Sequence, residues 1–263
     1  MNRYTQGKNL METFDSIAEL LRTLDSRDYV FKAHCRGESE PYDAEWTGYT
    51  SYEDAVSDLK HGLAEHVDAL NIKAAAYANS NTPRRYNDII GFAPDVPAAL
   101  MGIPENMLNI ELHNNTPVIT LYVDVARNAN TDVDEIAAYG RRVVGLIKSL
   151  ESQGISTCVY CLECMGYQNR RAIMALRVKA AGAPLDVKRL TFPLMSAAML
   201  RIIGFDWYER TQFPNGARHD IGVGREIYDG EAESLDFIKS TNRHALYINH
   251  NTDFDTLDIT AAL

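Results

Sequence analysis

One segment in the middle of the chain constrains the fold more than any other. It opens with "PVITLYVDVA" (117–126), which is β-branched and apolar almost throughout, as is typical of a strand covered on both faces. Thr131 and Asp132 offer helix N-caps, an apolar stripe with helical spacing follows, and Gly154 offers a helix end. "STCVYCLECM" (156–165) is a second strand. A strand, a helix and a strand in this order predict a parallel pair with a right-handed crossover, and hence an α/β fold.

Flanking segments extend this sheet and divide the chain into three parts. "RAIMALRVKA" (171–180) and "HALYINH" (244–250) predict two further strands. In the first third, "METFDSIAELLRTL" (11–24) and the stretch from Ser51 have helical spacing. We predict a mostly helical N-terminal part at 1–115, an α/β sheet domain at 116–250 and an acidic, apolar C-terminal tail at 251–263.

Composition places the chain among ordinary globular proteins. It has 263 residues, of which 46% are hydrophobic and 24% charged. No apolar run approaches the length of about 18 residues that predicts a membrane helix. The opening "MNRYTQGKNLMETFD" lacks the apolar middle of a signal peptide. Four cysteines in this length do not make a disulfide scaffold, so we expect a cytosolic protein.

Charge is distributed unevenly along the chain. The net charge is −10, but residues 140–210 hold eleven Lys and Arg against five Asp and Glu, which makes that stretch +6 and the rest −16. Such segregation predicts a cationic face on an acidic body. The alternative is that these are scattered, solvated charges on helix surfaces.

The basic stretch combines cations with aromatic residues, as proteins that hold single-stranded nucleic acid do. The cations grip phosphates and the flat rings stack on bases. The alternative is that the rings belong to the core. The predicted DNA-contact residues are Arg141, Arg142, Arg170, Arg171, Arg177, Lys179, Lys188, Arg189, Tyr167, Trp207 and Tyr208.

Asp124 lies at the carboxyl end of the first strand, where α/β sheets tend to bind ligands. The spacing Asp124–Ala126–Asn128 resembles the Asp-x-Ser-x-Ser metal site of von Willebrand A domains, with Ala126 and Asn128 in place of the two hydroxyl ligands. One carboxylate and one amide oxygen are few ligands for Mg²⁺. We therefore predict no metal at this position.

Neither the cysteines nor the histidines form a recognisable catalytic or metal motif. Along a strand, Cys158 and Cys164 face one way and Cys161 the other, and Cys35 is a doubtful fourth ligand. Buried strand cysteines are the favoured interpretation. No nucleophile elbow, H-E-x-x-H or phosphate-binding loop is present. We predict that the chain is not an enzyme, with no catalytic residues and no cofactor.

Four segments carry a resemblance to known proteins: "RRYNDIIGFAPDVPAALMGIPENM", "VITLYVDVARNAN", "VDEIAAYGRRVVGLIKSLESQG" and "APLDVKRLTFPLMSAAMLRIIGF". Over about residues 46–225 the chain looks like a bacteriophage protein family whose members mostly lack an assigned function. The resemblance implies a von Willebrand A-like sheet with flanking helices. It also implies similarity to the podophage cofactors, early proteins that bind single-stranded DNA and recruit a phage-encoded RNA polymerase. A phage transcription cofactor in the host cytoplasm, forming homo-oligomers, is the expected function.

The tail "NTDFDTLDITAAL" (251–263) resembles the acidic, apolar-tipped tails of bacterial single-stranded-DNA-binding proteins. Its acids would steer it to a basic pocket, and Phe254, Leu257 and Ile259 would supply burial. We predict that these three residues are buried against the chain's own body, a partner or another subunit. The same acids can occupy the chain's own cationic groove and compete with DNA.

A second function remains open. Von Willebrand A-like domains often act as protein-interaction adaptors, for example beside AAA+ ATPases, with or without a bound Mg²⁺. Under this hypothesis Asp124 matters and the arginine pairs do not.

Overall fold

The computed structural model describes residues 1–30, 44–70, 84–88, 93–111, 117–128, 130–167, 170–214, 224–227 and 231–259. Cys35 lies outside these ranges.

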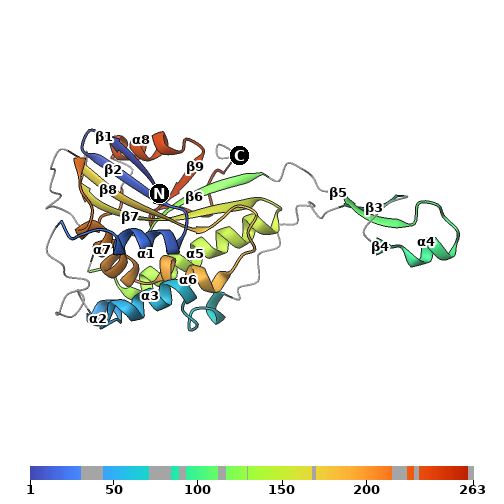
Figure 1. Ribbon diagram of the computed structural model, residues 1–263, viewed down its shortest axis with the longest axis horizontal. Coiled ribbons are helices and arrows are strands. Elements are labelled where there is room, and N and C mark those ends of the chain that lie inside the picture. The colour runs from blue at the N-terminus through green and yellow to red at the C-terminus, as the bar shows by residue number, and fades with distance from the viewer. Residues whose placement is uncertain are drawn as a thin grey trace.

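A six-stranded mixed sheet forms the centre of the molecule, with strand order β1-β2-β8-β7-β6-β9 (Figure 1). β6 is parallel to β7 on one side and to β9 on the other, whereas β7 and β8 are antiparallel. The mixed sheet with flanking helices confirms the predicted α/β fold. The strands are β1 Asn2–Gln6, β2 Asn9–Phe14, β6 Val118–Asp124, β7 Ser156–Tyr167, β8 Arg170–Lys179 and β9 Ala245–Ile248.

The predicted strand–helix–strand unit is present as β6, α5 (Val133–Ser152) and β7. Asp132 caps the helix, because its side chain accepts a hydrogen bond from the backbone N–H of Asp134. The predicted apolar stripe is buried, and its residues Val143, Val144 and Ile147 are fully inaccessible to solvent. Register places Asp124, the last residue of β6, beside Leu162 of β7.

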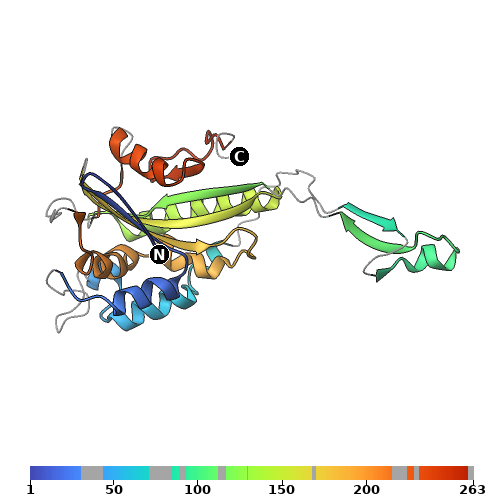
Figure 2. The ribbon, with the colours of Figure 1, turned by 45° about the horizontal axis from the view of Figure 1, so that its top comes forward.

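Helices cover the sheet unequally (Figure 2). The larger core lies under α1, α3, α5, α6 and the π-helix, and the smaller lies under α8 on the opposite face. No helix in the described part of the chain is long and apolar enough to cross a membrane. Besides α5, the helices around the main sheet are α1 Ile17–Asp25, α2 Ala44–Thr47, α3 Tyr52–His61, the 3₁₀ turn Asp68–Leu70, α6 Val187–Met195, the π-helix Met199–Gly204, α7 Phe205–Glu209 and α8 Ala232–Thr241.

The N-terminal third differs from the prediction. β1 and β2 belong to the main sheet, and β2 pairs in parallel with β8, so a boundary at residue 115 does not separate a helical part from the sheet. The helix predicted over 11–24 is wrong for its first residues, because β2 continues to Phe14 and α1 starts after the N-cap Ser16. β2 is buried on both faces and α1 follows it closely. Their apolar residues together therefore gave one continuous helical pattern in the sequence.

A small second sheet lies apart from the main one in both views (Figures 1 and 2). Its strand order is β3-β5-β4, from Arg84–Asp88, Met107–Glu111 and Ala93–Pro94. The short helix α4 (Val96–Leu100), capped by Asp95, follows β4. We call residues 84–111 the arm.

Glu163 of β7 is a buried acid on the face of the main sheet that carries the larger core. It is fully buried, and neither carboxyl oxygen has a hydrogen-bond partner among the described residues. Its side chain packs against Gly204, the last residue of the π-helix. Burial, and then the charge of Asp124, raise the pKa of Glu163 well above its usual value. The neutral acid is therefore the form that this core accommodates.

Replacing Glu163 by Gln should remove a pH dependence of folding stability. The folded-state pKa lies above the unfolded one, so Glu163 costs nothing below the unfolded pKa and increasingly destabilises the fold as pH rises toward the folded pKa. The wild type should lose at most about 1.4 kcal/mol per pH unit from this group between pH 5 and 8. Urea unfolding across this range should show a flatter profile for Glu163→Gln.

The exposed Glu233 provides the control, since Glu233→Gln should leave the profile unchanged. Identical profiles for the wild type and Glu163→Gln would show that Glu163 does not carry the effect.

Candidate functional site

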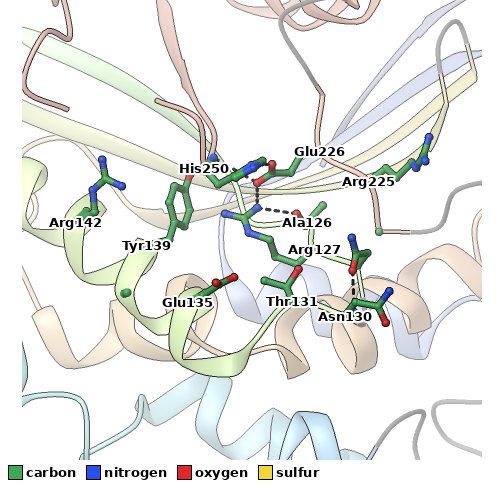
Figure 3. Close-up of a pocket in the computed structure, with 13 residues that line it drawn as sticks. Ala126, Arg127, Asn130, Thr131, Glu135, Tyr139, Arg142, Arg225, Glu226 and His250 are labelled. Atoms are coloured by element: carbon green, nitrogen blue, oxygen red, sulfur yellow. Dashed lines mark hydrogen bonds and ion pairs between the residues drawn. The ribbon is translucent and has the colours of Figure 1, made fainter. Parts of the chain in front are cut away.

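A cleft of about 680 Å³ opens where β6 ends, at the carboxyl edge of the parallel strands (Figure 3). Ligands of α/β sheets bind preferentially at this edge. Its walls come from the loop after β6, the first turns of α5, the segment 224–226 and His250, which lies two residues after the end of β9.

Arg127 lies at the centre of the cleft (Figure 3). Its Nη1 donates to the carbonyl of Ala126 at 2.7 Å and pairs with Glu226. Its guanidinium lies 4.5 Å from the centre of the Tyr139 ring. The other terminal nitrogen, Nη2, is buried and has no hydrogen-bond partner among the described residues. A buried, charged donor without an acceptor is the feature that most strongly indicates an anionic ligand here.

Glu226 connects the loop after β6 to the segment after β9. It is buried, and its carboxylate pairs with Arg127 and with the imidazole of His250. Gly224 makes this approach possible, because it has φ of +71° and a Cβ there would lie 2.9 Å from the carbonyl oxygen of Arg127. The negative charge of Glu226 is therefore already opposed by neighbouring groups.

The C-terminal segment contacts Arg142 and Tyr139, two residues that line the cleft. Arg142 lies 4.6 Å from the centre of the Phe254 ring and donates to the carbonyl of Thr252 at 3.3 Å. The Phe254 ring meets Tyr139 edge-on, with 6.5 Å between centroids. Phe254 and Ile259 pack against the larger core, half-buried against the chain's own body. The predicted role of Phe254, Leu257 and Ile259 in self-association stays a prediction.

Asp124 has a structural role. It is fully buried, and its carboxylate accepts hydrogen bonds from the backbone of Ala126 at 3.0 Å and Ile227 at 3.2 Å and from the hydroxyl of Tyr247. Burial raises its pKa. Within the described ranges no group of three or more His, Cys, Asp or Glu is placed to hold a metal ion.

The strand cysteines alternate between faces as predicted. Cys161 belongs to the larger core, where its thiol contacts the carbonyl of Pro193, and Cys164 belongs to the smaller core. Burial raises the pKa of both thiols, so both are held as unreactive neutral groups.

Burial excludes three residues from the predicted DNA-contact set. Arg171 is fully buried and pairs with Glu231, Lys179 pairs with Glu151 at 2.8 Å, and the indole of Trp207 donates to Glu12 at 2.8 Å. Each of the three is therefore engaged by an acid of the chain itself, and of these acids Glu12 is fully buried.

The remaining cations are spread over three elements. Arg170 starts β8, whereas Lys188 and Arg189 lie in the first turn of α6. Arg177 pairs with Asp15 at 3.3 Å. Arg141 and Arg142 lie on α5, and of these Arg142 lines the cleft.

The predicted stacking residues are placed as follows. Tyr208 is half-buried against Phe213, with 5.2 Å between ring centroids. The backbone of Tyr167 ends β7, and its side chain lies outside the described set.

Sequence inspection missed Arg127, Arg225, Glu226 and His250, four charged or titratable residues of the cleft. Arg127 had a usable signal, since it lies three residues after Asp124 at the carboxyl end of a predicted strand. The other three come from segments more than 90 residues further along the chain.

The fold and this cleft define an α/β protein with a cationic pocket at the carboxyl edge of its sheet. The chain belongs to the family described as "Domain of unknown function (DUF7192)", whose model matches residues 2–259. No curated protein and no solved structure matches the chain.

Neighbouring arginines at the start of β8 should behave very differently on substitution. Arg171→Ala leaves Glu231 and several carbonyl groups without their donor and should lower the free energy of unfolding by about 3–5 kcal/mol. Arg170→Ala, at an exposed position, should change it by less than about 0.5 kcal/mol. Urea unfolding of both variants measures the difference, and equal, small effects would contradict the structural role assigned to Arg171.

Proposed function

We propose that this chain is a phage-encoded, non-enzymatic protein that holds single-stranded DNA and recruits an RNA polymerase to it. The observation that supports this proposal best is the pairing of two separate surfaces on one chain. One is the cationic cleft of the main body, and the other is the apolar tip of the arm.

The cleft suits a flexible anionic strand. Arg127, Arg142 and Arg225 line it, against Glu135 and the already paired Glu226. Electrostatic attraction acts over about a Debye length of 10 Å, so a cleft of this kind attracts phosphates although the whole chain is acidic. It replaces the wider basic face as the proposed DNA contact.

The arm suits a protein partner. Four large apolar side chains of its tip are exposed: Val96 (57%), Leu100 (83%), Met101 (71%) and Ile103 (40%). The segment from Val96 to Ile103 carries no charge, which does not favour contact with a nucleic acid. Exposed apolar clusters of this kind usually mark protein contacts.

The same tip favours a second candidate, a protein-interaction adaptor without DNA binding, for example beside an AAA+ ATPase. The Mg²⁺-dependent form of this adaptor loses support, because Asp124 is buried and its oxygens accept hydrogen bonds from the chain itself. Binding of single-stranded DNA separates the two functions.

A fluorescent oligothymidylate should bind the full chain at low salt and be released as salt rises. The logarithm of the affinity should fall with the logarithm of salt concentration with a slope near −0.7 for each phosphate contact. Fluorescence anisotropy measures both, with a duplex of the same length as comparison. Absence of binding at low salt would leave the adaptor as the better function.

Polar substitution at the arm tip should separate the two surfaces. Leu100→Asp with Met101→Asp should abolish co-sedimentation with the RNA polymerase of the same phage, since a charge in an apolar contact is costly. Oligothymidylate affinity should stay within about twofold of the wild type, because no contact with the cleft is altered. Ser57→Asp on α3, within the body, provides a control for added charge. Unchanged polymerase binding by the arm variant would argue against the arm as the recruiting surface.

A further inference from the structure

We infer that the cleft is a binding site for a phosphate group of a nucleotide unit, and that Nη2 of Arg127 is its central donor. The inference deepens the proposed function, on which its choice of a DNA strand as the natural ligand rests. Phosphate binding itself can be tested without a strand.

Arg127 is held in place before any ligand arrives. Nη1 is engaged by Glu226 and by the carbonyl of Ala126, and the Tyr139 ring supports the guanidinium plane. Tyr139 is fixed in turn, because its hydroxyl donates to the carbonyl of Ile248 at 3.2 Å. Nη2 is buried and has no acceptor among the described residues, and Arg127 lines the cavity. A ligand oxygen that reached Nη2 would complete its bonding.

The surroundings favour phosphate. The 20-residue helix α5 begins at this edge, and the N-terminus of a helix favours anions, here against the N-cap Asp132 and the first-turn acids Asp134 and Glu135. Arg142 and Arg225 add further positive charge on the walls. A guanidinium with fixed N–H groups matches the geometry of phosphate oxygens better than an ammonium does.

The size of the cleft favours more than a bare ion. Its volume of about 680 Å³ falls within the range of about 300–1,000 Å³ that is usual for small-molecule sites. The side chains of Asn130 and Thr131, on the loop before α5, add polar groups to the lining (Figure 3). A phosphate with its sugar and base uses this space, whereas an inorganic phosphate leaves most of it unfilled.

Two carboxylates oppose the ligand to different degrees. Glu226 is compensated by Arg127 and contacts the imidazole of His250. Glu135, in the first turn of α5, is exposed at the mouth of the cleft. Removing the charge of Glu135 should therefore strengthen the binding of an anion, an effect that a purely structural role would not produce.

Isothermal titration of the full chain with thymidine 5′-monophosphate and with inorganic phosphate tests the inference at low salt. The nucleotide should bind saturably and more tightly than inorganic phosphate. Arg127→Lys, which keeps the charge beside Glu226 but loses the second N–H group, should weaken nucleotide binding about tenfold, as should Arg127→Gln. Glu135→Gln should bind about twofold more tightly. Arg243→Gln, exposed at the opposite end of β9, should bind like the wild type.

The outcomes distinguish this inference from the proposed function. Absence of saturable nucleotide binding, or equal binding by the wild type and Arg127→Lys, would overturn the phosphate site. If Arg127→Gln fails to fold, the opposite effects expected for Arg127→Lys and Glu135→Gln still decide the matter. Arg127-dependent nucleotide binding without oligothymidylate binding would support the site and remove the DNA function. Oligothymidylate binding that is insensitive to Arg127 would retain the DNA function and overturn the site.

Discussion

The buried ion pair between Arg127 and Glu226 holds the functional edge of this molecule together. It joins the loop after β6 to the irregular segment 224–227. The backbone N–H and C=O groups of this segment find hydrogen-bond partners in other parts of the chain. Arg171 donates to the carbonyl groups of Arg225 and Glu226, and Asp124 accepts from the N–H of Ile227. The amide of Asn249 donates to the carbonyl of Ile227 at 3.1 Å. A buried loop without secondary structure needs such partners for its polar groups.

Asp124, Arg127, Arg171 and Glu226 place four buried charged side chains near this edge of the sheet. Each charged side chain there stabilises the position of another segment, and the cleft is the space that these segments leave between them. Removing one partner exposes the other to the full cost of desolvation, so the charges are structurally interdependent. One donor, Nη2 of Arg127, lies outside this internal pairing among the described residues. The geometry of the cleft thus follows from the packing of these segments. The unpartnered N–H groups of Nη2 are what point to a ligand.

The sequence predicted the centre of the sheet because its local patterns and its tertiary structure agree. β6 and β9 lie within the predicted segments, β7 and β8 match theirs to within two residues at each end, and α5 starts at a predicted N-cap. It failed for β2, where a buried strand ran directly into a helix. It also failed to separate surface cations from buried ones, because Arg170 and Arg171 are adjacent and identical in type, yet one is exposed and the other fully buried. The strand alternation that separates them was visible, but the buried acids that each cation would meet were not. Glu231 lies 60 residues from Arg171, and local patterns carry no information about such pairs.

The pairing of β2 with β8 has a consequence for how this chain is made. Leu10 lies beside Ala172, so the first strands reach their neighbour only after more than 160 further residues have been synthesised. Until then the apolar side chains of β2 have no partner strand on that side, and the sheet cannot close around them. Contacts of such high sequence separation slow folding and prolong the exposure of unpaired strands. During synthesis, the N-terminal strands of this protein therefore remain available to chaperones and to aggregation until β8 has emerged.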